Sequence, residues 1–246
     1  MRVNDRRAMM AKLLDDMYAR IDDAVAREII LKNWGEADGK HILTSKLAAV
    51  TNIGSVFQGS EIESVNWMRY FTNLSNISGL FQNCKNLTDV DLSFLNVSNV
   101  TRCFGMFNGC SNIKHIKLNG WDAGKINNIQ SMFEGCSSLT ELDLSGWKNA
   151  GNNVTANTYI SFSGLHSLNI LNLSGWTNTT MSSFAFYGSK QPEKLILYGC
   201  PVETVDFWKN NASNLWGWDS TKWPVIYTDD HIWKYANNKW NDISEE

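Results

Sequence analysis

Phenylalanine followed two residues later by glycine or asparagine recurs six times in this 246-residue chain, and the residues around each pair resemble one another. Successive phenylalanines are 24, 26, 26, 29 and 24 residues apart. Self-similarity with a period of this length is typical of stacked repeats, in which each unit contacts only its neighbours. The sequence therefore predicts a solenoid. The pairs are Phe57/Gly59, Phe81/Asn83, Phe107/Gly109, Phe133/Gly135, Phe162/Gly164 and Phe186/Gly188.

Most repeats also carry aliphatic residues in the order L-x-x-L-x-L. The alternation predicts a short strand whose every second side chain points inward. One such strand cannot bury its apolar face alone, whereas stacked copies can form a parallel sheet over a continuous core. In the first repeat the corresponding residues, Ile62, Val65 and Trp67, come one residue early, and we count it as an atypical terminal repeat. The regular triplets are Leu87/Val90/Leu92, Ile113/Ile116/Leu118, Leu139/Leu142/Leu144 and Leu168/Leu171/Leu173, and the last repeat keeps Leu195/Leu197.

Further columns of the repeat predict the rest of the core. The phenylalanine is expected inside. The glycine or asparagine is expected in a turn with positive φ, where a Cβ costs about 1–2 kcal/mol. Three residues after the last strand leucine comes a bulky apolar column that should close one edge of the core. This column consists of Leu95, Trp121, Trp147, Trp176 and Cys200.

The segment MFEGCSSLTELDLSGW (132–147) combines these features, and its Phe, Gly, Cys, aliphatic, Ser and Trp positions recur in register. It resembles the BspA-type leucine-rich repeat of bacterial surface proteins, which has a period of about 26 residues. The resemblance covers about residues 57–200 and is best over 80–176. It implies a leucine-rich-repeat solenoid of about six coils, with short parallel strands and an irregular or short-helical convex side. It also implies non-catalytic adhesion or binding at a cell surface.

Composition narrows the classes of partner. The formal net charge is −3 with both signs interspersed, whereas nucleic-acid binding needs a basic patch. No apolar run approaches the roughly 18 residues of a membrane span. The N-terminal MRVNDRRAMMAKLLDDMYAR lacks a continuous apolar stretch and a small-residue cleavage site, so it does not read as a secretory signal. We therefore expect no nucleic-acid partner, no membrane span and no export by the standard route.

Three of the five cysteines, Cys84, Cys110 and Cys136, occupy one column of the repeat, where later repeats have Leu165 and Ser189. Zinc binding or disulfides are conceivable there, because adjacent coils bring equivalent positions to about 5 Å. The alternative is a buried column of small apolar thiols. The substitution by leucine and the absence of C-x-x-C favour buried thiols.

Residues 4–34 are predicted to form one amphipathic helix, with Asn4 as N-cap and Gly35 as the stop. Such a helix would be about 45 Å long, whereas six coils span only about 25–30 Å. Unless it bends or breaks, part of its apolar stripe must pack on a second copy or a larger assembly. The alternative is an N-terminal cap on the first coil. The residues predicted to mediate assembly are Met10, Leu14, Met17, Ile21 and Val25.

The chain from Pro201 onward is rich in tryptophan, and two short strands are predicted on either side of a turn at Asp229–Asp230. Aromatic rings with polar rims could bind a glycan. The alternative is an aromatic-rich C-terminal cap that covers the last coil, because terminal coils expose core and edge. The tryptophans are Trp208, Trp216, Trp218, Trp223, Trp233 and Trp240.

No catalytic or metal motif occurs, so no catalytic residue, metal or cofactor is predicted. The outward strand residues form the candidate binding face, on which Asp91, Lys117 and Asp143 should pair across neighbouring strands. This face measures only about 350–400 Å², against about 800 Å² per side of a standard interface. Flanking segments must therefore contribute, or binding must be multivalent. The candidate residues are Asp89, Asp91, His115, Lys117, Glu141, Asp143, Ile170, Asn172, Lys194 and Ile196.

The sequence thus predicts an N-terminal helix (1–35), a connector (36–56), the solenoid (57–200) and a Trp-rich C-terminal cap (201–246). The favoured function is a non-enzymatic protein-interaction or structural module. The N-terminal helix would hold it in a larger assembly, such as a phage virion-type particle, where the repeat surface is displayed for recognition or adhesion. The alternative is an adhesin of the bacterial cell surface that binds a host protein or a glycan.

Overall fold

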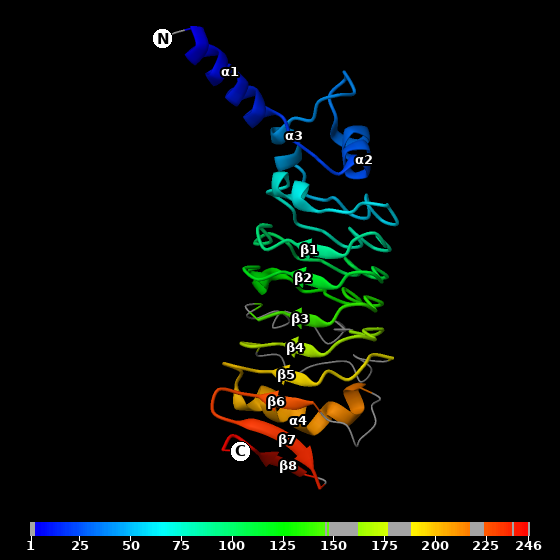
Figure 1. Cartoon of the computed structure of the whole chain (residues 1–246), viewed down its shortest axis with the longest axis vertical. Helices are drawn as coiled ribbons and strands as arrows, with labels where there is room; N and C mark the ends of the chain where they lie inside the picture. Colours follow the sequence, from blue (N-terminus) through cyan, green and yellow to red (C-terminus); the bar gives the residue numbers. More distant parts are fainter. Residues whose placement is uncertain are drawn as a thin grey trace.

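Successive coils stack along the longest axis of the molecule (Figure 1). The helices α1 (Val3–Met17), α2 (Ala24–Trp34) and α3 (Thr44–Ala48) lie at one end of the stack. The helix α4 (Val202–Trp216) and three further strands lie at the other end. The computed structural model describes residues 3–145, 147, 162–176, 188–216, 224–237 and 239–245, without the side chains of residues 3, 4, 11, 14, 15 and 211–216.

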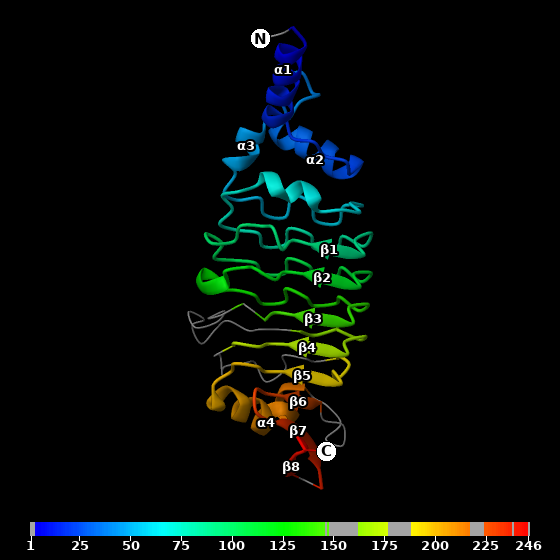
Figure 2. The ribbon, with the colours of Figure 1, turned by 60° about the vertical axis from the view of Figure 1, so that its left-hand side comes forward.

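Five short strands lie one above another along the same side of the stack (Figures 1 and 2). Each has three residues, and the middle one is buried. β1 pairs with β2, and β3 pairs with β4 and β4 with β5, all in parallel. This arrangement confirms the predicted repeat solenoid with parallel strands. The strands are β1 (Asp89–Asp91), β2 (His115–Lys117), β3 (Glu141–Asp143), β4 (Ile170–Asn172) and β5 (Lys194–Ile196).

A second set of main-chain contacts joins the coils away from these strands. Single-residue parallel bridges connect Asn52 to Asn76, Asn76 to Arg102, and Arg102 to Asn128. Coils in the first part of the stack are therefore held at two places around their circumference.

The phenylalanine column forms the centre of the core, as predicted. Phe57, Phe81, Phe107, Phe133 and Phe162 are all buried. Their ring centroids follow one another at 6.3, 5.7, 6.0 and 6.4 Å. The sixth phenylalanine, at position 186, lies outside the described residues.

The cysteine column is buried, and its thiols donate hydrogen bonds to the phenylalanine carbonyl of the preceding coil. All five cysteines are free, and burial raises the pKa of the Cys110 thiol to about 12. Among the described residues no cluster could hold a metal ion. The three column cysteines are buried, as the buried-thiol interpretation predicts. The bonds run from Cys84 to Phe57 O (3.0 Å), from Cys110 to Phe81 O (2.9 Å) and from Cys136 to Phe107 O (3.2 Å), and Ser189 Oγ reaches Phe162 O in the same way (2.6 Å).

The N-terminal segment corrects the prediction of one helix over 4–34, because it forms two helices. The Asp23 carboxylate caps α2 by accepting from Ala26 N at 2.9 Å. Before it, Ala19 N donates to Ile42 O at 2.8 Å, and Tyr18 forms a bridge with Leu43. Pairing with the connector therefore replaces the helical hydrogen bonds in between. The predicted stop at Gly35 is correct, since α2 ends there.

The first repeat has no strand. The 3₁₀ helix η1 (Asn66–Tyr70) takes its place, although Ile62, Val65 and Trp67 are buried as the repeat pattern requires. This atypical coil lies directly beneath the N-terminal helices in Figure 2.

The C-terminal segment continues the sheet of the solenoid. β6 (Val225–Tyr227) pairs in parallel with β5, and β7 (Ile232–Ala236) and β8 (Lys239–Asp242) follow antiparallel. The predicted pair of strands around Asp229–Asp230 is confirmed, whereas α4 was not predicted. Trp208 of α4 is buried. Trp218, Trp223 and the side chain of Trp216 lie outside the described part of the chain.

The glycine column gives a test of coil spacing. Gly164 has φ +76°, and a Cβ there would lie 2.9 Å from Gly135 N and 3.1 Å from Gly135 Cα. Gly59 has φ +69° and nothing within 4 Å. We expect Gly59→Ala to cost about 1–2 kcal/mol from backbone strain. Gly164→Ala should cost a further 1–3 kcal/mol or so, because it forces two backbones apart.

Urea unfolding of both variants measures the difference. Equal losses of unfolding free energy would contradict the close approach of the two coils at this column.

Candidate functional site

The ten residues predicted to bind a partner share one exposed face of the stack. They are the first and third residues of strands β1 to β5, and each flanks a buried middle residue. They are in register where the strands are hydrogen-bonded. Between β1 and β2, Asp89 lies opposite His115, and across β3, β4 and β5 the residues Glu141, Ile170 and Lys194 follow one another. The structure therefore brings the predicted residues together as two columns.

The first two strands are joined by ion pairs. His115 Nδ1 lies 2.7 Å from Asp89 Oδ1, and Lys117 Nζ lies 3.8 Å from Asp91 Oδ2. The hydrogen bond from His115, with a second from Thr88, lowers the pKa of the Asp89 carboxyl. Both pairs are solvent-exposed, and such pairs contribute little to stability. They do orient four polar side chains on this face.

Three of the predicted residues also form the turns that end β1, β3 and β4. The side-chain Oδ1 atoms of Asp91, Asp143 and Asn172 accept hydrogen bonds from the backbone N–H two residues later, at 3.1, 2.8 and 3.1 Å. This is an Asx turn. Sequence reasoning missed this role, although the signal is present as Asp or Asn two residues before a serine at 93, 145 and 174.

The joint between β2 and β3 differs from the other joints. Leu92 N donates to Lys117 O at 3.0 Å, and one strand pair further on Leu144 N donates to Asn172 O at 2.9 Å. Leu118 occupies the same position, but within the described residues no backbone hydrogen bond joins β2 to β3, and the two strands belong to separate sheets. On another side of the same coils the bonds persist, since Phe107 N donates to Met132 O at 2.9 Å. Within the described residues, the backbone hydrogen bonds between these two coils are therefore interrupted on the strand side and kept beside the phenylalanines.

The tryptophan column shows the same interruption. Trp121 Nε1 donates to Leu92 O at 2.8 Å, and Trp176 Nε1 donates to Leu144 O at 2.9 Å. Trp147 lies between them, and its buried Nε1 has no hydrogen-bond partner. The rings of Trp121 and Trp147 stack with centroids 5.4 Å apart, which is less than the 5.7–6.4 Å between successive phenylalanine rings. At this joint the Trp147 indole therefore stacks on its neighbour but does not bond to a carbonyl of the preceding coil.

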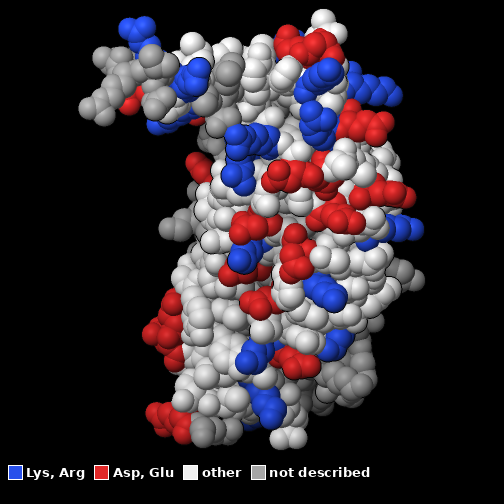
Figure 3. Space-filling view, turned by 45° about the horizontal axis from the view of Figure 1, so that its top comes forward, with Lys and Arg blue, Asp and Glu red and all other residues white. Residues whose placement is uncertain are grey.

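A groove of about 440 Å³ lies at the opened joint. No ion pair crosses it from His115 or Lys117 to Glu141 or Asp143, in contrast to the pairs between β1 and β2. In the space-filling view acidic and basic side chains are mixed over the visible face, rather than gathered by sign (Figure 3). The groove is lined by His115, Ile116, Lys117, Leu118, Asn119, Glu141 and Asp143.

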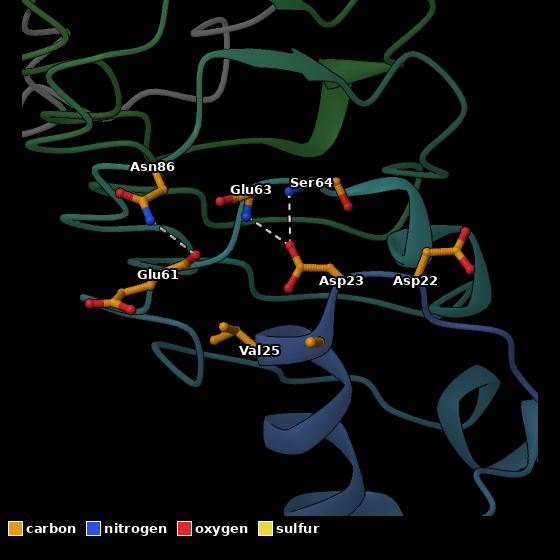
Figure 4. Close-up of a pocket in the computed structure, with 8 residues that line it drawn as sticks. Asp22, Asp23, Val25, Glu61, Glu63, Ser64 and Asn86 are labelled. Atoms are coloured by element: carbon orange, nitrogen blue, oxygen red, sulfur yellow. Dashed lines mark hydrogen bonds between the residues drawn. The ribbon is translucent and has the colours of Figure 1, made fainter.

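A second hollow, of about 530 Å³, lies where the N-terminal segment meets the first coil (Figure 4). Its central carboxylate, Asp23, is fully used in structural bonds. Besides capping α2, its Oδ2 accepts from Glu63 N at 2.7 Å and from Ser64 N at 3.0 Å. The hollow therefore marks the attachment of the N-terminal helices, and we do not assign it a ligand.

The residues predicted to mediate assembly fall into two groups. Met10 and Met17 are exposed on α1, together with Met9 and Leu13. Ile21 lies between the helices and is buried in the core, and Val25 packs against that core. The side chain of Leu14 is not among those described. No described helix is long and apolar enough to cross a membrane.

The fold and its outward columns define a repeat solenoid. A model of a protein family, described as "Mycoplasma protein of unknown function, DUF285", matches residues 51–176, and the chain belongs to this family. A search of curated proteins finds no match. Among solved structures, the chain is similar to an internalin from Listeria monocytogenes, with 16% identity and a TM-score of 0.28. That match covers 78% of this chain and 61% of the internalin.

Three matched substitutions test the opened joint. Trp121→Phe and Trp176→Phe each remove a hydrogen bond to a buried carbonyl, whereas Trp147→Phe removes an N–H that has no partner. We expect the first two variants to lose about 1 kcal/mol more unfolding free energy than the third. Chemical denaturation of the three variants measures these losses of unfolding free energy. An equal loss in all three would show that Trp147 Nε1 is hydrogen-bonded.

Proposed function

We propose that this protein is a non-enzymatic recognition module whose strand face binds a protein partner at the groove between β2 and β3, and whose helix α1 holds it in a larger assembly. The observation that carries the proposal is the acidic side of the groove. Glu141 and Asp143 line it, and neither forms an ion pair with a described cation. On the neighbouring joint the corresponding carboxylates are paired.

The surroundings of the two carboxylates suggest the chemistry of the partner. Beyond Glu141 and Asp143 the outward columns continue with Ile170 and Asn172, and then with Lys194 and Ile196. A partner segment could match this face with a lysine or arginine against the two carboxylates, followed by aliphatic side chains against Ile170 and Ile196. Charge complementarity of this kind contributes mainly to specificity and association rate.

Exposed aromatic residues follow the first and the last of these five strands in the chain. Phe94 is 42% exposed just after β1, and Tyr198 is 46% exposed just after β5. The Arg69 guanidinium lies 5.8 Å from the centroid of the Phe94 ring. Tyrosine, phenylalanine and arginine are frequent in protein interfaces. These residues supply flanking contact area of the kind that a sheet with strands about 10 Å long needs.

The proposed location of the module rests on the resemblance of its repeat to the BspA type. This resemblance favours display on a surface. A phage virion-type particle and the bacterial cell surface both stay predictions, and so does adhesion to a host protein. A glycan partner for the aromatic tail has less support. Lys209 Nζ covers the Trp233 ring at 3.5 Å from its centroid, and Trp240 Nε1 donates to Lys209 O.

Photo-crosslinking tests the recognition proposal. A photoreactive amino acid in place of Lys117 should give a protein adduct in cells that make this chain. Charge reversal by Glu141→Lys with Asp143→Lys should reduce the adduct by about tenfold or more, because both carboxylates would become repulsive.

The matched control is Glu61→Lys with Glu63→Lys, which makes the same change in charge at the second hollow. It should leave the adduct at position 117 unchanged. No adduct, or equal loss with both charge reversals, would contradict a partner bound at the β2–β3 groove.

A further inference from the structure

Helix α1 extends away from the coils (Figures 1 and 2), and hydrogen bonds to α3 hold its C-terminal end. There, Thr44 Oγ1 donates to Asp16 O at 3.1 Å and to Met17 O at 3.2 Å. Apolar side chains of the helix are left in solvent, with Met9 54% exposed and Leu13 46% exposed. An exposed apolar stripe on a helix that is held in a fixed direction is suited to pack on another helix.

One line of exposed side chains on this helix has charged residues at its two ends, and Met10 and Met17 are also exposed, at 60% and 48%. Arg6, Met9, Leu13 and Asp16 are spaced by three, four and three residues, so they lie on one side of the helix, in the seam positions of a two-helix coiled coil. The order along this seam is basic, apolar, apolar, acidic. All four side chains are exposed.

This seam is complementary to itself in one orientation. If two copies of α1 pack antiparallel about position 11, Arg6 lies opposite Asp16 of the other copy, and Met9 lies opposite Leu13. A parallel pair would instead place Arg6 against Arg6 and Asp16 against Asp16. Arg6 is near the positive N-terminal end of its own helix and Asp16 near the negative end, which is unfavourable within one helix and is compensated by an antiparallel neighbour.

The attachment of α1 also permits this orientation. The coils lie beyond the C-terminal end of the helix (Figure 1). In an antiparallel pair the two solenoids therefore lie at opposite ends of the helix pair and do not collide. Resting on the proposed role of α1 in assembly, we propose that its partner is a second copy of this chain, bound as a two-fold antiparallel helix pair. The interface is isologous, and each Arg6–Asp16 contact occurs twice.

The size of the contact predicts a weak dimer. A helix of 15 residues is about 22 Å long, and a single seam covers far less than the roughly 800 Å² per side of a standard interface. The pair therefore exchanges with monomer, and it becomes useful where many copies are held close together.

Sedimentation velocity of the purified full chain over a range of concentrations tests this proposal. Wild type should show a monomer–dimer equilibrium. R6D and D16R should each raise the dissociation constant about tenfold, because two attractive contacts become repulsive. The double variant R6D/D16R should return to near the wild-type value, and an equimolar mixture of R6D and D16R should form a heterodimer.

R7D is the matched control, because it makes the same charge change on a residue away from the seam. It should dimerise as wild type does. A wild type that stays monomeric, including one whose α1 binds another protein, would overturn the proposal, and so would loss of dimer in R7D equal to that in R6D. The adduct at position 117 reports on the strand face separately, so its persistence in R6D distinguishes failure of this inference from failure of the proposed recognition role.

Discussion

Buried side chains that donate hydrogen bonds to main-chain carbonyls of the preceding coil hold this solenoid in register. The thiols of the cysteine column reach the repeated phenylalanine, and the indoles of Trp121 and Trp176 reach the last strand leucine. A slip of one coil against the next would leave each of these buried indole N–H groups without a partner, which costs about 1–3 kcal/mol, and would also break the weaker thiol bonds. Strands of three residues could not fix the register alone. The exposed columns are therefore aligned by contacts inside the stack.

The joint between β2 and β3 lacks these contacts. Trp147 Nε1 has no carbonyl partner, no backbone hydrogen bond joins the two strands in the described part of the chain, and the β3 carboxylates form no ion pair with β2. The interruption inside the stack and the groove on the surface thus occur at the same joint.

The repeat could be predicted from the sequence because each of its columns has one dominant physical requirement. Gly164 needs positive φ, Phe107 needs burial, and Cys110 is small and apolar. The break between α1 and α2 could not be predicted, because it depends on pairing of Ala19 with Ile42, which are distant in sequence. The groove could not be predicted either, because it depends on which backbone hydrogen bonds form between two neighbouring coils. The outward position of Glu141 and Asp143 was predicted, but their lack of ion pairs was not, because the sequence pattern favoured an unbroken row of charge pairs.

Amide hydrogen exchange tests the central claim most directly, because Leu92, Leu118 and Leu144 occupy the same position in three successive coils. Leu92 N and Leu144 N donate across their joints, whereas Leu118 N does not. Leu92 and Leu144 should therefore be strongly protected, and Leu118 should exchange about tenfold faster or more. Equal protection of all three amides would show that the strand face is continuous and would contradict a groove between β2 and β3.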